Sequence, residues 1–138
     1  MKIFLFIFIL AEITLANEWI YDCTMNLSIP IQPNTVITNQ KLIDCTEAKI
    51  FWNYPMNSLT SVFSSKDNKP FQFCLINSNQ IYFDIPVYRV EGNKETLVVK
   101  SDDNVCMQSD SLTNTVTIRF AAPKQMKYYG VFIDYSIQ

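Results

Sequence analysis

The side chains with most scope for chemistry in this 138-residue sequence are four cysteines, because the chain contains no histidine. They are Cys23, Cys45, Cys74 and Cys106. No two of them stand at the short spacing of a zinc knuckle, so we expect no metal site. An even number of cysteines in an exported chain indicates two disulfide bonds. Four cysteines permit three pairings, and spacing alone does not choose among them.

Catalytic groups are scarce in the rest of the sequence. The lack of histidine excludes Ser-His-Asp and Cys-His catalysis. Paired carboxylates serve as acid and base in glycosidases, but Asp102 and Asp103 are adjacent and would point to opposite faces of a strand. With only two glycines, the chain has no glycine-rich phosphate loop. We therefore expect a protein that is not an enzyme and needs no cofactor. A carboxylate-based secreted hydrolase is the alternative that we rank lowest.

The N-terminus has the pattern of a secretory signal peptide. Lys2 precedes an unbroken apolar run over residues 3–10, and Thr14 and Ala16 fit the positions that signal peptidase reads. The run is shorter than the roughly 20 apolar residues that span a bilayer. We therefore expect residues 1–16 to be removed and the protein to be extracellular, with no membrane span. The net charge of −2, without a basic cluster, argues against nucleic-acid binding.

Strand periodicity dominates the second half of the mature chain. Residues 81–88, 96–100, 114–120 and 131–137 alternate or are rich in β-branched residues, and turn-forming segments separate them. The first half is less regular, with short strands expected at 27–31, 35–38, 49–52 and 71–76 and a polar loop at 57–69. Many short strands without a helical stripe predict one all-β domain, an antiparallel β-sandwich.

The C-terminal strands resemble those of the CUB domain family, a group of extracellular β-sandwiches of the jelly-roll type. The matching features are the alternating strand at 116–120, the loop at 121–129, and Gly130 opening the strand at 131–135. In this family the glycine would let the loop turn sharply into the last strand. Weaker likenesses are found at residues 53–55, 74–76 and 104–106. The resemblance implies a CUB-like domain at 45–138, with residues 17–44 as an N-terminal extension outside it or as an additional strand.

The resemblance also implies a disulfide pairing and a cation site. It pairs Cys45 with Cys74, which leaves Cys23 for Cys106; the main rival pairing is Cys23–Cys45 with Cys74–Cys106. Many CUB domains bind calcium through three acidic residues. Only Glu91 stands at such a position here, and a hard cation needs several carboxylate oxygens. We expect no calcium and interpret Glu91 as a solvated turn residue.

By resemblance, the function would be binding of an extracellular protein or a carbohydrate, with a role in host defence. Tyrosines with a wet hydroxyl suit such recognition. The candidates are two outward strand residues and two loop residues, namely Tyr82, Tyr88, Tyr128 and Tyr129. The alternative is a carrier of small apolar ligands on another β-sandwich. Asn26 begins an Asn-Leu-Ser glycosylation sequon, which predicts a glycoprotein.

Cleavage after Ala16 is directly testable. Protein recovered from the culture medium of expressing cells should begin at Asn17 on N-terminal sequencing, because Thr14 and Ala16 direct the peptidase there. A product that retains Met1, or one found only inside the cells, would contradict the signal peptide.

Overall fold

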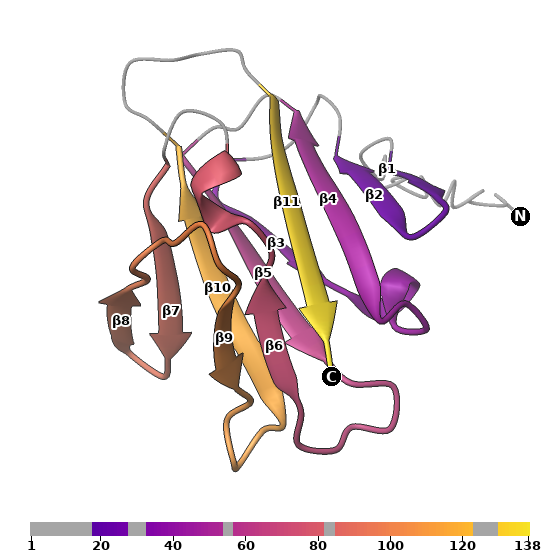
Figure 1. Ribbon diagram of the computed structural model, residues 1–138, viewed down its shortest axis with the longest axis vertical. Coiled ribbons are helices and arrows are strands. Elements are labelled where there is room, and N and C mark those ends of the chain that lie inside the picture. The colour runs from indigo at the N-terminus through magenta and orange to yellow at the C-terminus, as the bar shows by residue number, and fades with distance from the viewer. Residues whose placement is uncertain (1–17, 28–32, 54–56, 82–84, 123–129) are drawn as a thin grey trace, which may run out of the picture.

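A computed structural model describes residues 18–27, 33–53, 57–81, 85–122 and 130–138 of the chain (Figure 1). The predicted signal peptide at 1–16 lies outside these ranges. The strands are β1 Glu18–Tyr21, β2 Thr24–Leu27, β3 Thr35–Thr38, β4 Glu47–Asn53, β5 Ser58–Ser64, β6 Gln72–Leu75, β7 Val87–Glu91, β8 Lys94–Leu97, β9 Val105–Gln108, β10 Thr115–Ala121 and β11 Gly130–Ile137. Within the described ranges, short 3₁₀ helices occur at η1 Gln40–Leu42 and η2 Ser78–Gln80.

The strands form two sheets that pack face to face, so the expected all-β sandwich is confirmed (Figure 1). In the described part of the chain, sheet A has six strands in the order β1-β2-β4-β11-β6-β9, and sheet B has five in the order β3-β5-β10-β7-β8. In the parts of the chain that are described, strands from residues 17–44 belong to both sheets. The sequence left open whether this segment joins the sandwich, and its described residues do. No helix in the described ranges is long and apolar enough to cross a membrane.

Strand direction departs from the expected antiparallel arrangement at two places. Among the strand pairs of the described residues, seven are antiparallel, but β2 pairs with β4 and β3 pairs with β5 in parallel. Parallel neighbours need a long crossover. Here the chain alternates between the sheets from β2 to β5, so a strand of the opposite sheet serves as each crossover. Side-chain periodicity does not record strand direction, which is why the sequence did not indicate it.

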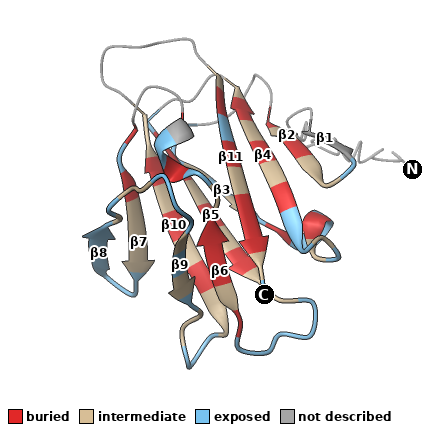
Figure 2. Ribbon diagram, in the orientation of Figure 1, coloured by how far each residue is buried: buried red, intermediate tan, exposed pale blue. Residues whose placement is uncertain are grey.

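The core lies between the inner faces of the two sheets (Figure 2). The alternating residues Val116, Ile118 and Phe120 of β10 and Val131, Ile133 and Tyr135 of β11 are all buried, whereas Ile137, on the same face at the end of β11, is half-buried. Phe63 of sheet B lies with its ring centroid 4.4 Å from that of Phe73 and 4.7 Å from that of Tyr135 in sheet A. These rings join the two sheets at the centre of the sandwich.

One expected loop is a central strand. Residues 57–69 were interpreted as a polar loop, which is wrong over Ser58–Ser64, because these residues form β5. Leu59, Ser61 and Phe63 face the core and are almost completely buried. Ser61 at an inward position interrupted the apolar alternation, so the periodic signal of a strand was lost.

The disulfides correct the pairing that the CUB resemblance implied. The bonds are Cys23–Cys45 and Cys74–Cys106, which is the rival pairing. Because β2 and β4 are parallel neighbours, Cys23 before β2 and Cys45 before β4 lie at the same end, with Cα atoms 5.9 Å apart. Cys74 and Cys106 are directly opposite in β6 and β9. Without a Cys45–Cys74 bond, the CUB resemblance loses its support in the first half of the chain.

Gly130 is required by a neighbouring ring rather than by a turn. Its backbone is not in the left-handed region, but a Cβ atom at this position would lie 2.6 Å from the Phe51 ring. The ring of Phe51 is held in a stack with that of Phe132, with centroids 4.5 Å apart. Any side chain at Gly130 would therefore push Phe51 out of its stack.

Substitution of Gly130 should reveal this contact. Gly130→Ala is expected to lower the free energy of unfolding by about 1–2 kcal/mol, because the added methyl group displaces the Phe51 ring. In a Phe51→Ala background the same substitution should cost less than about 0.5 kcal/mol. Urea denaturation of the four variants measures the coupling.

Gly92 provides the matched control. It has a φ of +59° with no atom near its absent Cβ, so Gly92→Ala should cost the same in both backgrounds. An equal cost for Gly130→Ala with and without the Phe51 ring would refute the contact as the reason for this glycine.

Candidate functional site

The outer face of sheet B carries one row of side chains that crosses all its strands. Strand register aligns the members in the order Val36, Thr60, Arg119, Tyr88 and Leu97. The two ends are apolar and open to solvent, with Val36 66% and Leu97 58% exposed. At the spacing of neighbouring strands, the row is about 19 Å long. We call this set the Tyr88 row.

The centre of the Tyr88 row is a fixed arginine. Arg119 donates two hydrogen bonds to Glu95, from Nε to Oε1 and from Nη2 to Oε2, each 2.7 Å long. The Arg119 Cζ atom also lies 4.4 Å from the centroid of the Tyr88 ring. The hydrogen bonds from Arg119 lower the pKa of Glu95, and those to Glu95 raise the pKa of Arg119. Arg119 is thus held across β7 between an aromatic ring and a carboxylate, in a geometry that a lysine does not reproduce.

Only one of the four candidate tyrosines can be placed. Tyr88 is half-buried on the outer face of β7, the side opposite the buried Val87. The other three, Tyr82, Tyr128 and Tyr129, lie outside the described residues. Arg119 and Glu95 were not singled out from the sequence. Their meeting depends on the register of β10, β7 and β8, which no local pattern reveals.

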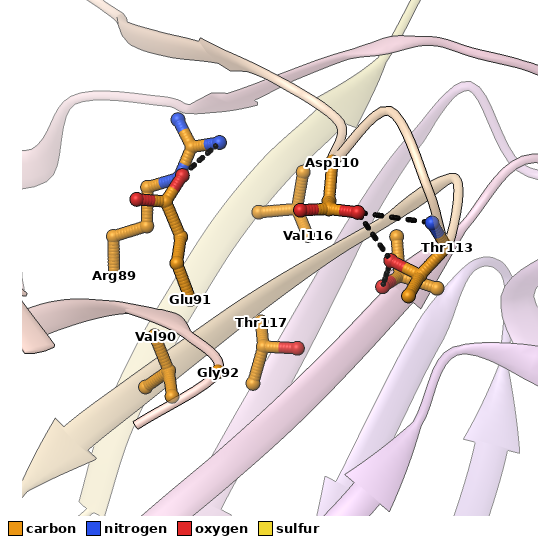
Figure 3. A pocket seen from close by; sticks show the side chains of 9 residues that line it. Arg89, Val90, Glu91, Gly92, Asp110, Thr113, Val116 and Thr117 are labelled. Atoms are coloured by element: carbon orange, nitrogen blue, oxygen red, sulfur yellow. Dashed lines mark hydrogen bonds and ion pairs between the residues drawn. The ribbon is translucent and has the colours of Figure 1, made fainter. Parts of the chain in front are cut away.

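A hollow of about 140 Å³ lies near Arg89, Glu91, Asp110 and Thr113, and valine side chains also line it (Figure 3). Arg89 donates to the Gln108 carbonyl of β9 at 2.8 Å, so it links sheet B to the edge of sheet A. Glu91 was expected to be a solvated turn residue. It is exposed, but it is the last residue of strand β7 rather than part of the turn, and its carboxylate pairs with Arg89 at 2.9 Å.

Asp110 is held at the rim of the same hollow by its own loop. Its Oδ1 atom accepts hydrogen bonds from the backbone N–H groups of Thr113 and Leu112, which lower the pKa of its carboxyl. Within the described ranges, no group of three or more acidic, cysteine or histidine side chains is placed to hold a metal ion. Asp102 accepts a hydrogen bond from Asn79, and both Asp102 and Asp103 are exposed.

Sheet A carries a second set of outward side chains, none of which was predicted from the sequence to be part of a site. Phe51 of β4 and Phe132 of β11 are directly opposite and stacked, and Lys49 and Asp134 form the neighbouring cross-strand pair. The available signal was Phe132 itself, an aromatic residue between the inward positions Val131 and Ile133.

Asn26 of the predicted glycosylation sequon lies beside Phe51 in the register of β2 and β4. It is half-buried, and its Oδ1 atom is enclosed without a hydrogen-bond partner among the described residues. Ser28 of the sequon lies outside those residues, so glycosylation at Asn26 stays a prediction.

Comparisons with known proteins give no family for this chain. No protein-family model matches the sequence, and no curated protein matches it. Among solved structures, the chain is similar to a crystal structure of the pre-peptidase C-terminal domain of a collagenase from Bacillus anthracis. That match has 7% sequence identity and a TM-score of 0.43, and covers 78% of this chain and 99% of the other. At this level the likeness supports no conclusion about function.

Proposed function

We propose that this protein is a secreted, non-enzymatic binding module that recognises an extracellular protein through the Tyr88 row. The observation that carries the proposal is Arg119, held between Tyr88 and Glu95 at the middle of a row with exposed apolar ends. Two disulfide bonds support an extracellular location, since such bonds persist in oxidising compartments.

The composition of the row favours a protein partner. Tyrosine and arginine are the residue types most enriched among side chains that dominate binding energy at protein interfaces. Their positions here are fixed before any partner arrives, so less side-chain entropy is lost on binding. The row runs across an extended sheet surface with solvent-exposed apolar ends, and an interface with another protein can bury such a surface.

The carrier and hydrolase alternatives receive less support. An internal ligand needs a cavity of several hundred cubic ångströms. The inner faces are instead filled by buried aromatic rings in contact, including Phe63, Phe73 and Tyr135. A carboxylate-based hydrolase needs two carboxylates that face each other across a site. Asp102 and Asp103 are adjacent in the chain and both exposed, so they do not support this alternative. A role in host defence stays a prediction of the CUB resemblance.

Site-directed photo-cross-linking tests the proposed face. A photoreactive side chain placed at Val36 or at Leu97 should capture one partner from the extracellular fluid of the source tissue. The matched control is Leu112, which is 92% exposed and lies in a loop outside the Tyr88 row. The same reactive group at Leu112 should not capture that partner.

Affinity measurements with the captured partner complete this test. Tyr88→Ala and Arg119→Ala should each weaken binding by more than about 1 kcal/mol, roughly fivefold in Kd, with little change in melting temperature. Leu112→Ala should leave Kd unchanged. Equal capture from all three positions, or an unchanged Kd for both row variants, would refute the Tyr88 row as the binding face.

A further inference from the structure

The outer face of sheet A carries a pair of aromatic side chains that are not part of the buried core. Phe51 and Phe132 stand opposite each other on β4 and β11, adjacent strands near the middle of sheet A (Figure 1). Their rings are stacked at 4.5 Å, and Phe132 remains 49% exposed. Gly130 leaves room for the Phe51 ring in this position. The chain therefore keeps a fixed, partly wet aromatic surface on the face that points away from the core.

Charged groups border this aromatic surface. Lys49 Nζ lies 3.3 Å from an Asp134 carboxylate oxygen and 5.5 Å from the centroid of the Phe132 ring. Both charged side chains are more than two-fifths exposed, at 45% for Lys49 and 41% for Asp134. An apolar ring, a hydrogen-bond donor and a hydrogen-bond acceptor are thus adjacent on one open surface.

Two adjoining open hollows lie beside this surface, and Phe132 lines the smaller of them. One has a volume of about 220 Å³ and is lined by Phe132 and Ile81 together with Lys49, Asp134, Ile76 and Asn77. The other has a volume of about 420 Å³ and shares the last four of these residues. Its remaining lining residues are Asp22, Cys23, Thr24, Glu47 and Ala48. The Cys23–Cys45 disulfide fixes the rim of the larger hollow.

We infer that these hollows form a binding site for a neutral carbohydrate. A pyranose ring has an apolar C–H face, which packs on an aromatic surface such as Phe132, and a rim of hydroxyl groups. The Asp134 carboxylate accepts hydrogen bonds, the Lys49 ammonium donates them, and the Asn77 amide does both. Vicinal hydroxyl groups, each a donor and an acceptor, match this combination.

The charges around the site select against acidic sugars. The lining residues include three carboxylates, from Asp22, Glu47 and Asp134, and one ammonium, from Lys49, which gives a local charge of −2. A sialylated, uronic or sulfated glycan would be repelled, whereas a neutral sugar carries no such penalty. The site belongs to the opposite sheet from the Tyr88 row, so it does not depend on the proposed protein-binding face.

A glycan array tests the inference with defined probes. The array should contain neutral oligosaccharides ending in glucose, galactose, mannose, fucose, xylose, N-acetylglucosamine or N-acetylgalactosamine, with sialylated and sulfated counterparts. The protein should bind one or more neutral members and bind their acidic counterparts less. Phe132→Ala and Asp134→Asn should each weaken the Kd for the best member by roughly tenfold.

Two controls separate binding from folding and from the other face. Phe132→Tyr keeps the aromatic ring and should restore most of the affinity that Phe132→Ala loses. Tyr88→Ala should leave glycan binding unchanged. Failure to bind any neutral glycan, preference for acidic ones, or binding that survives both Phe132→Ala and Asp134→Asn would overturn the inference while leaving the Tyr88 row untouched.

Discussion

The contact of Phe63 with Phe73 and Tyr135 is the interaction on which the rest of the structure depends. It joins sheet B to sheet A with ring centroids 4.4 Å and 4.7 Å apart, and all three side chains are fully buried. Burial raises the pKa of the Tyr135 hydroxyl, so this residue remains a neutral phenol within the core. Successive side chains of a strand point to opposite faces of the sheet. The residues that pack between the two sheets therefore determine which residues point outward. This packing therefore determines that the Tyr88 row and the aromatic pair Phe51 and Phe132 lie on the outer faces of the sandwich.

The sequence predicted the fold best where alternation was uninterrupted. The inward face of β10 followed from the sequence, because Val116, Ile118 and Phe120 alternate with more polar residues and are buried. β5 was mistaken for a loop because Ser61 occupies an inward position. The parallel direction of β2 and β4 could not be predicted from the alternation of side chains. This direction places Cys23 next to Cys45. The Cys45–Cys74 disulfide implied by the CUB resemblance is wrong because it was taken from an alignment to that family. The observed disulfides instead follow the strands that are neighbours in this fold.

The two candidate surfaces were predictable to different degrees. The outward position of Tyr88 followed from its place beside the buried Val87. Its partners did not, because Arg119 and Glu95 reach it from strands paired through long-range register. Phe132 was visible in the pattern as an aromatic residue on the polar side of β11. Its significance depends on Phe51, whose position opposite it is a property of the β4–β11 pairing. Local sequence patterns thus predicted which face of a strand a side chain is on. Which side chains lie together on that face depends on the order and register of the strands.

Among the described residues, buried side chains occupy the space between the two sheets, so we expect recognition to take place on the outer faces. Native mass spectrometry of the purified protein tests this most directly. The account predicts a mass equal to that of the mature polypeptide with two disulfides and any covalent glycan, unchanged by extraction with organic solvent. A stoichiometric apolar adduct that the solvent removes would contradict it, because such a ligand requires a cavity where Phe63, Phe73 and Tyr135 are packed.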